Sequence, residues 1–377
     1  MTPLWRKKKT QETQIHFLAE LLSAYSPSGK EQTVAEILRK EMSALGYNVK
    51  RDEVGNIIGE IGEGSLAILL CGHMDTVPGY IPVRMADGRL YGRGAVDAKG
   101  PLAALVLAAA QAAKEASGMK ITVAAVVEEE RKSKGIKHLI AQNLKVDYAI
   151  FGEPSGVENI TIGYKGSLHL KFTLKTGTGH SAAPWLYDNA AEKAYELWLE
   201  IKRNHSKFVR PESQYNSVTL CLTRLSSGSR GASIVPSKCQ MQVDMRIPPG
   251  LASTQLLEET EKVLACFKTA NPKVDISFLV EDSNEPFEVE KHSPLVRAIS
   301  YSIRKVRNKQ PTLLRKTGTG DMNILGHTMR IPVVTYGPGN SHLDHTPKEH
   351  IMIKDYLDSI EIYKTALLRL NELHKNN

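Results

Sequence analysis

The sequence predicts an α/β protein in which a mixed-sheet domain is interrupted by a smaller α+β domain. Its length of 377 residues exceeds what one hydrophobic core usually organises, so two domains are expected. Up to about residue 164, short apolar runs alternate with helical patterns, as in α/β sheets. Residues 165–283 instead follow the order strand–helix–strand–strand–helix–strand, which is typical of a ferredoxin-like domain. We therefore expect residues 1–164 and 284–377 to form the main domain and residues 165–283 to be inserted into it.

The first part of the main domain begins with two helical patterns. Apolar residues recur at helical spacing in 15–22 and in 31–45, and Pro27-Ser28-Gly29 separates the two segments. Residues 47–61 alternate between apolar and polar, with a hairpin turn expected at Val54-Gly55-Asn56. The apolar run 67–70 predicts a buried strand. The remaining expected elements are a helix at 102–116, a strand at 121–127, a helix at 134–143 and a strand at 146–151.

The inserted domain and the closing part of the main domain follow by the same criteria. In the insertion we expect strands at 167–176, 217–225, 238–246 and 274–280, and helices at 189–203 and 253–269. The chain then returns to the main domain with a helix at 294–306, a Gly-rich loop at 317–321, a strand at 333–336 and a helix at 354–373.

Composition narrows the class of protein. Hydrophobic residues make up 41% of the chain and charged residues 24%, as in globular proteins that dissolve in water. No apolar run is long enough to span a membrane, and the basic N-terminus does not continue into the apolar segment of a secretory signal. Four cysteines are scattered without CxxC spacing, which favours an intracellular, cytoplasmic protein over a disulfide framework.

The chain is basic, with a net charge of +8 and a pI of about 9.1. A basic balance can indicate nucleic-acid binding. Here the basic residues are spread over several segments without interleaved aromatics, which make up only 6% of the chain, so no nucleic-acid partner is expected. An acidic protein or an acidic substrate fits the charge better.

Polar groups with metal-binding chemistry stand where the expected strands end. In α/β sheets, chemistry gathers beyond the carboxyl ends of the strands. His73 and Asp75 follow the central strand two residues apart, so that they emerge on the same side. Asp97 follows the Gly-rich turn at 92–94. The other candidates of this kind are Glu129, Glu130, Glu153, His342 and His345.

Each of these groups has an ordinary structural explanation when it is taken alone. A single histidine at a strand end often caps a loop, a Glu-Glu-Glu run is often a solvated turn, and Gly-Glu-Pro is often only a turn. The turn at 92–94 lacks the third glycine and the following helix of a dinucleotide fingerprint. The two Thr-Gly-Thr-Gly segments lack the Lys-Ser/Thr of a P-loop. Together, however, two histidines, three carboxylates and a further glutamate form the ligand set and base of a co-catalytic zinc pair.

The order and spacing of these motifs resemble the dinuclear zinc hydrolases that include aminoacylase, succinyl-diaminopimelate desuccinylase, acetylornithine deacetylase and bacterial glutamate carboxypeptidase. The resemblance spans essentially the whole chain after residue 12. It implies a zinc-peptidase-like catalytic domain with an inserted lid domain. The matching motifs are Gly72–Pro78, Gly92–Gly100, Glu129-Glu130 with Gly135 five residues later, Gly152–Ser155, and Asp344–Glu349.

The resemblance implies a role for each residue of this set. His73 and Glu153 would bind one zinc ion, Glu130 and His345 the other, and Asp97 would bridge both. His345 matches rather than His342, because the family's ligand is followed four residues later by Glu, here Glu349. Asp75 would orient His73, and Glu129 would be the general base. Cobalt or manganese could replace zinc at ligands of this kind.

Four further residues, in the inserted domain and the Gly-rich loop, are implied to bind or activate the substrate. His180 matches a lid histidine that stabilises the oxyanion, and its alternative is a loop cap after Gly179. Arg246 matches an arginine that binds a substrate carboxylate, and its alternative is a salt bridge within the lid sheet. Ser233 stands where the family usually has Asn, and Gly320 lies in a Gly-rich loop that departs from the usual pattern. Both departures fall in substrate-recognition segments.

Members of the family commonly dimerise through the lid, so a homodimer is expected.

Among subgroups, the segments 25–29, 52–56 and 94–104 look most like the prokaryotic hydrolases that release lysine or ornithine from a carrier protein. That resemblance implies hydrolysis of the amide at the C-terminal glutamate of an acidic amino-group carrier protein, in lysine or arginine biosynthesis. The positive charge is consistent with an acidic carrier. The alternatives are a deacylase or dipeptidase for a free small substrate, of the acetylornithine or succinyl-diaminopimelate type, and a non-catalytic binding module on the same fold.

Overall fold

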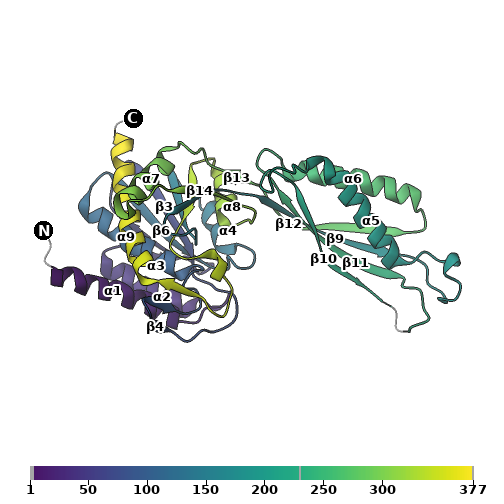
Figure 1. The fold of residues 1–377 in the computed structure, drawn as a ribbon, viewed down its shortest axis with the longest axis horizontal. Helices are drawn as coiled ribbons and strands as arrows, with labels where there is room; N and C mark the ends of the chain where they lie inside the picture. The colour runs from purple at the N-terminus through teal and green to yellow at the C-terminus, as the bar shows by residue number, and fades with distance from the viewer. Residues whose placement is uncertain (1–3, 229–230, 376–377) are drawn as a thin grey trace. The chain divides into compact units, whose positions relative to one another are not determined.

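The computed structural model describes residues 4–228 and 231–375, and these divide into two compact units. The first unit contains residues 1–163, 289–315 and 320–377, and the second contains residues 164–288 and 316–319. The first three residues of the basic N-terminal segment lie outside the described part of the chain. The second unit thus extends a few residues beyond the expected insertion and takes up part of the Gly-rich loop. Figure 1 shows both units.

The first unit is built around a mixed sheet in which the strands run in the order β1-β2-β6-β3-β7-β15-β8. The strands of this unit are β1 (Asn48–Arg51), β2 (Ile57–Ile61), β3 (Leu66–His73), β4 (Arg84–Ala86), β5 (Arg89–Tyr91), β6 (Met119–Val126), β7 (Tyr148–Gly152), β8 (Asn159–Tyr164), β14 (Thr312–Lys316), β15 (Val333–Tyr336) and β16 (His350–Met352). The helices are α1 (Leu4–Ser23), α2 (Gln32–Leu45), α3 (Lys99–Glu115), α4 (Lys134–Ala141), α7 (Pro294–Arg307), α8 (Asp321–Met329) and α9 (Ile353–Lys375).

Helix α3 is the central helix of this unit and is buried almost all round. Its Ala- and Leu-rich sequence packs on β3 and β6, and α9 covers it and packs in turn on α7 (Figure 1). A helix that is apolar on all sides requires such burial. Elsewhere in the unit, α8 packs on β15 and on α4.

The parallel pairing of β3 positions the candidate site. Strand β3 runs parallel to β6 on one side and to β7 on the other, with His73 opposite Val126 and Cys71 opposite Phe151. Parallel strands end at the same edge of a sheet. The segments that follow β3, β6 and β7 therefore begin close together, and these are the segments that carry Asp75, Glu129 and Glu153.

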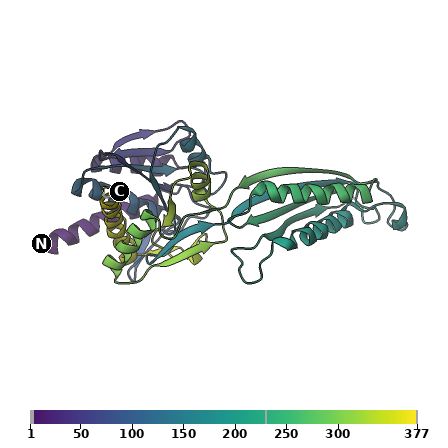
Figure 2. The same cartoon turned by 90° about the horizontal axis from the view of Figure 1, so that it is seen from above.

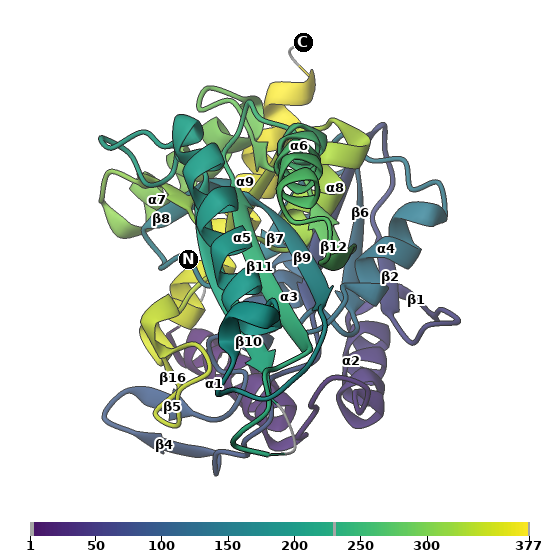
Figure 3. The same ribbon diagram turned by 90° about the vertical axis from the view of Figure 1, so that its right-hand side faces the viewer.

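The second unit has the split βαβ order expected from the sequence. Strands β9 (Gly166–Lys175), β10 (Thr219–Ser227), β11 (Lys238–Ile247) and β12 (Asp275–Asn284) form an antiparallel sheet in the order β10-β11-β9-β12. Helices α5 (Ala190–His205) and α6 (Ser253–Ala270) cover the same face of this sheet (Figures 2 and 3). The unit also contains β13 (Phe287–Glu288) and the 3₁₀ turns η1 (Pro184–Leu186) and η2 (Ser206–Phe208).

Strict alternation along β11 divides the two faces of this sheet. Met241, Val243 and Met245 are buried in the core beneath the helices. Side chains two apart on a strand point the same way. Asp244 and Arg246 therefore lie on the face of the sheet that the helices leave open.

Several elements differ from the sequence-based expectation. Strands β4, β5 and β16, which form a small separate sheet, were not expected, because three-residue strands have too few positions to show alternation. Strands β8 and β14 and helix α8 were also missed. Helix α1 begins earlier than expected, within the basic N-terminal segment. No helix in the described part of the chain is long and apolar enough to cross a membrane.

Candidate metal centre

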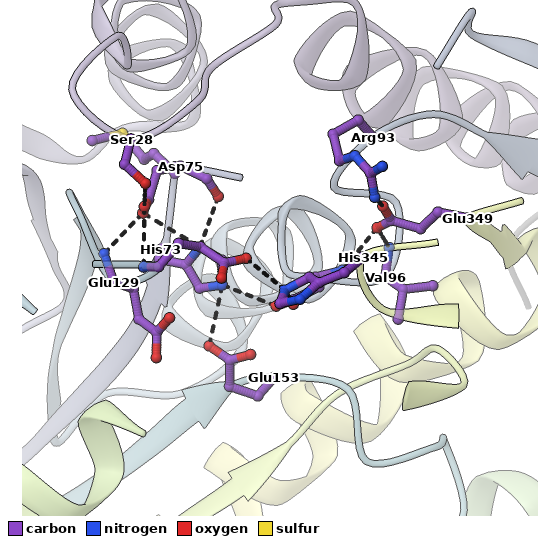
Figure 4. Close-up of polar contacts among 12 residues, drawn as sticks. Ser28, His73, Asp75, Arg93, Val96, Glu129, Glu153, His345 and Glu349 are labelled. Carbon is purple, nitrogen blue, oxygen red and sulfur yellow. Dashed lines mark hydrogen bonds and ion pairs between the residues drawn. The ribbon is translucent and has the colours of Figure 1, made fainter. Parts of the chain in front are cut away.

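His73, the last residue of β3, is almost fully buried and is held by its own loop. Its Nδ1 donates a hydrogen bond to the backbone carbonyl of Asp75 at 2.8 Å, which turns Nε2 toward the carboxylates. Nε2 lies 3.1 Å from Oδ1 of Asp97 and 3.5 Å from Oε1 of Glu153 (Figure 4). Burial lowers the pKa of His73, but the carboxylates of Glu153, Asp75 and Asp97 outweigh it and raise the pKa well above its usual value.

Asp97 lies between the two candidate histidines. Its Oδ1 faces Nε2 of His73, and its Oδ2 lies 3.0 Å from Nε2 of His345. The same nitrogen of His345 lies 3.0 Å from Oε1 of Glu130. Burial raises the pKa of Asp97, but hydrogen bonds with His345 and His73 outweigh burial. The pKa of Asp97 is therefore below its usual value, and the carboxyl stays ionised. The hydrogen bond with Asp97 and the charge of Glu130 raise the pKa of His345 to about 9, so an ion that binds Nε2 must displace a proton.

A buried ion pair holds the loop that carries Asp97. Glu349 is fully buried, and its Oε1 accepts hydrogen bonds from the backbone N–H groups of Val96 at 2.9 Å and Asp97 at 3.1 Å. Its Oε2 accepts a hydrogen bond from Nη1 of Arg93 at 2.8 Å (Figure 4). Removing one partner would leave a buried charge uncompensated, at a cost of about 3–5 kcal/mol. Because Glu349 follows His345 by four residues, this pair also ties the His345 segment to the Asp97 loop.

Asp75 holds the segment after β6 as well as the loop after β3. Its carboxylate accepts hydrogen bonds from the hydroxyl of Ser28 at 2.7 Å and from the backbone N–H groups of Glu129 at 3.0 Å and Glu130 at 3.2 Å. The same carboxylate is 3.5 Å from Nδ1 of His73. The orientation of His73 thus depends mainly on the backbone carbonyl of Asp75, and the carboxylate connects the histidine to the two glutamates.

Glu129 and Glu130 follow the end of β6, where the regular strand is broken. Glu128 has a φ of 55°, in the left-handed region, so the alternation of a strand no longer separates the two side chains that follow. The side chain of Glu130 faces His345. That of Glu129 lies against Gly320, where an added Cβ would be 3.8 Å from Oε1. Burial, and then the charge of Asp321, raise the pKa of Glu129 well above its usual value, which suits a group that takes up protons.

The other candidate residues lie in the second unit. His180 is exposed, and its Nδ1 accepts a hydrogen bond from the backbone N–H of Ala182 at 3.1 Å. In the neutral imidazole the proton therefore resides on Nε2, which can donate to a substrate oxygen. Ser233 contributes its backbone carbonyl, which accepts a hydrogen bond from the N–H of Ser181 at 2.9 Å. That bond joins the Ser233 segment to the His180 loop.

Arg246 is about one-third exposed and is oriented by two neighbours. Its Nη2 donates a hydrogen bond to Oδ2 of Asp244 at 2.9 Å, and its Nη1 donates one to the hydroxyl of Thr319 at 3.2 Å. The salt bridge considered as an alternative role is therefore present. It also holds the guanidinium in place on the open face of the sheet, so it does not conflict with a role in binding a carboxylate.

The donor set of the first unit fits divalent metal ions. Ligand atoms of His73, Asp97 and Glu130 all lie within 4.8 Å of one another, and Glu153 and His345 lie beside them. Three carboxylates face two imidazoles in this partly buried cluster, and a divalent cation would offset the excess of negative charge. Imidazole nitrogen and carboxylate oxygen are ligands that zinc and related divalent ions accept.

Residues 69–369 match peptidase family M20/M25/M40, and this range contains every candidate site residue named above. The chain belongs to this family. It is therefore a hydrolase of a metal-dependent class.

Relatives of similar length match almost the whole M20-family chain. A Pyrococcus furiosus protein, provisionally named LysW-lysine/LysW-ornithine hydrolase, is 42% identical over 96% of this chain and 98% of its own length. The LysW-lysine hydrolase of Deinococcus radiodurans is 34% identical over 94% of this chain and 96% of its own. The LysW-lysine/LysW-ornithine hydrolase of Sulfurisphaera tokodaii is 33% identical over 94% of both chains.

Solved structures agree on the fold. The M20 family metallo-carboxypeptidase Sso-CP2 from Sulfolobus solfataricus superposes with a TM-score of 0.82 at 21% identity, covering 95% of this chain and 99% of its own. A tripeptidase from Staphylococcus aureus superposes with a TM-score of 0.81 at 20% identity, covering 96% and 99%. The expected zinc-peptidase-like fold class is thereby confirmed.

Sequence reasoning missed the residues that support the site. Glu349 served only to choose between His342 and His345, and Arg93 was considered only as part of a Gly-rich turn. Ser28 and Asp321 were not singled out. All four are polar residues buried in a predominantly apolar unit. That property, however, cannot be recognised until the fold is known.

The geometry predicts different effects for Asp97 and Asp75. Asp97→Ala should lose the metal that the cluster binds, because the two oxygens of Asp97 face the two candidate imidazoles separately. Asp75→Ala should keep most of its metal and lose about 10–100-fold in activity, because Asp75 touches the ligands only through hydrogen bonds. Metal content by mass spectrometry and hydrolysis rates would test this order. Full metal content in Asp97→Ala, or none in Asp75→Ala, would contradict it.

Proposed function

We propose that the protein is an amide hydrolase that releases lysine, ornithine or both from the C-terminal glutamate of an acidic amino-group carrier protein. The main support is the near full-length similarity to relatives named LysW-lysine and LysW-ornithine hydrolases. Such a reaction belongs to lysine or arginine biosynthesis. The four cysteines are free, which suits a reducing cytoplasm.

The proposed cofactor is a pair of zinc ions, for which cobalt could substitute. His73 and Glu153 would hold one ion, His345 and Glu130 the other, and Asp97 would bind both. This division is supported by the two oxygens of Asp97, which face different imidazoles. When bound, such ions supply Lewis-acid polarisation of a carbonyl and make a coordinated water more acidic.

The protein's own groups then carry the proton. Glu129 accepts a proton from the attacking water and donates it to the leaving amine, and its raised pKa matches this task. The Nε2–H of His180 donates a hydrogen bond to the oxygen on which negative charge develops. The guanidinium of Arg246 binds a substrate carboxylate, with Ser233 and Gly320 in the segments that contact the rest of the substrate.

A substrate comparison tests the proposed reaction. Zinc-loaded protein should release lysine or ornithine from the carrier-linked amide, and not act comparably on N-acetylornithine or N-succinyl-diaminopimelate. Glu129→Gln should lower kcat by about 10²–10⁴-fold while retaining its metal, because it loses the base but no ligand. Turnover of only the free small substrates would indicate the deacylase alternative. An unchanged rate of hydrolysis in Glu129→Gln would show that Glu129 is not the general base.

Four exposed basic residues follow the candidate base and would attract an acidic carrier. They are Arg131, Lys132, Lys134 and Lys137. They directly follow Glu130 in the chain, so they add positive charge to the segment after the candidate base. A positive rim raises the association rate of a negatively charged partner, and salt screens that effect.

Salt dependence provides the corresponding prediction. The double variant Lys132→Gln/Lys134→Gln should lower kcat/KM for the carrier substrate by roughly threefold to tenfold at low salt, and this difference should disappear near 1 M salt. Lys114→Gln is the control. Lys114 is exposed near the far end of α3, about 22 Å along the helix from the loop that carries Asp97. Equal losses in both variants at every salt concentration would contradict electrostatic attraction by these residues.

We further propose that two copies associate through the second unit, which would act as a lid. Helices α5 and α6 border a cavity of about 720 Å³ with Leu199, Val263 and Phe267 in its lining. Tyr195 is 51% exposed and Leu199 40% exposed on α5, and β10 is an edge strand of the sheet.

Light scattering should therefore give the mass of a dimer, and Tyr195→Glu/Leu199→Glu should give the mass of a monomer. A monomeric wild-type protein at micromolar concentration would refute the dimer.

A further inference from the structure

We propose that Asn56 is a positioning residue for the loop of residues 127–133, which carries Glu129 and Glu130. The inference rests on the proposed roles of these two glutamates. Asn56 lies in the hairpin turn between β1 and β2, away from the candidate ligands in sequence, and its side chain is fully buried. It has no assigned part in the reaction described above.

The side-chain amide of Asn56 joins the two ends of the loop. Its Oδ1 accepts a hydrogen bond from the backbone N–H of Val127 at 3.0 Å, where the loop leaves β6. Its Nδ2 donates a hydrogen bond to the backbone carbonyl of Gly135 at 3.0 Å, where the loop enters α4. The amide oxygen must face the N–H of Val127 and the amide nitrogen must face the carbonyl of Gly135, so the orientation of the Asn56 side chain is unambiguous.

The hairpin turn is itself organised to hold this amide. Oδ2 of Asp52 accepts a second hydrogen bond from Nδ2 of Asn56 at 2.7 Å. Its Oδ1 accepts from the backbone N–H groups of Val54, Gly55 and Asn56 at 2.9–3.1 Å. This is an Asx turn, which keeps the backbone of the hairpin in one conformation. The amide therefore extends from a rigid base.

Gly135 is matched to Asn56 by size. A Cβ at residue 135 would lie 2.5 Å from Oδ1 of Asn56 and 2.6 Å from the backbone nitrogen of Val127. Both distances are shorter than a Cβ atom makes with non-bonded atoms in proteins. The nitrogen of Val127 belongs to the backbone, so it cannot move aside as a flexible side chain would. Glycine at 135 thus permits the close approach in which Asn56 joins the ends of the loop.

The loop needs an external restraint because its backbone is unfavourable. Glu128 and Ser133, near its two ends, have φ values of 55° and 52°. Residues with a Cβ rarely adopt this left-handed conformation, and it persists only where surrounding contacts enforce it. Asp75 holds the middle of the loop through the N–H groups of Glu129 and Glu130. Asn56 holds the ends, and the backbone N–H of Gly135 adds a hydrogen bond to the carbonyl of Val127 at 3.1 Å. Asp75 and Asn56 are thus the side chains that restrain the loop from outside it, at its middle and at its ends.

The test separates positioning from general stabilisation. Asn56→Ala is compared with Asn371→Ala, because Asn371 is also buried and its Nδ2 donates to the carbonyl of Ser117 at 3.0 Å. Ser117 precedes β6, so this control removes a similar hydrogen bond at the opposite end of the same strand. Thermal unfolding, affinity for Zn²⁺ and Co²⁺, and the visible absorption spectrum of the cobalt-loaded protein are measured for each variant.

Asn56→Ala should weaken metal binding by about tenfold or more and change the cobalt spectrum, because Glu130 is no longer held in place. Asn371→Ala should also lower the melting temperature, by less because it loses one side-chain hydrogen bond rather than three, and should leave metal affinity within about twofold of the wild type. Asn56→Ser is measured alongside: its side chain is too short to join Val127 to Gly135 but leaves a hydroxyl in the buried turn, so it should show the same loss and is the test if Asn56→Ala does not fold. Wild-type metal affinity and spectrum in the folded Asn56 variants would overturn the proposal.

These readouts do not depend on the carrier substrate. If the wild-type protein does not hydrolyse carrier-linked lysine while Asn56→Ala still loses metal affinity, the proposed function fails and the positioning role stands. If the wild-type protein hydrolyses the carrier substrate and Asn56→Ala binds metal normally, the positioning role fails alone.

Discussion

The crowding of buried and half-buried carboxylates at one edge of the sheet is the constraint that the surrounding loops of the first unit satisfy. Asp75, Glu129, Glu130 and Glu153 gather at one edge of the sheet because β3, β6 and β7 run parallel and end there, and the loop before α3 adds Asp97. An unpaired buried carboxylate is costly, and several together are more so. Most of these acids face hydrogen-bond donors or imidazoles, whereas burial and the charge of Asp321 raise the pKa of Glu129 instead.

The partners divide the acids into two groups. Asp75 and Glu349 each accept hydrogen bonds from two backbone N–H groups. Asp75 accepts a further hydrogen bond from Ser28, and Glu349 accepts one from Arg93. These two acids hold the loops that carry Asp97, Glu129 and Glu130. Asp97, Glu130 and Glu153 face imidazole nitrogens instead. A metal ion can replace a proton on imidazole, whereas it cannot replace a backbone N–H. This difference distinguishes the candidate ligands from the acids that position them.

Much of the architecture could be predicted from the sequence, because long elements carry a clear period. Helices α2, α5 and α6 and strands β9 and β11 lie within a few residues of their expected positions. The turn at Val54-Gly55-Asn56 was expected from its Gly-Asn sequence and connects β1 to β2. The short strands β4, β5 and β16 and helix α8 were not expected. Elements of this length form because of tertiary contacts, and local periodicity does not reveal them.

The sequence by itself determined the kinds of chemical group available and the strand ends that carry them, because strand periodicity and turn residues are local properties. It also determined the order of motifs, and hence the family to which the chain belongs. Only the tertiary structure decided how those groups are held. Arg93 and Glu349 are 256 residues apart, and Asn56 and Gly135 are 79 apart. Partners at such separations meet only when the sheet has assembled, so the hydrogen bonds that aim Asp97 and Glu129 are consequences of the fold.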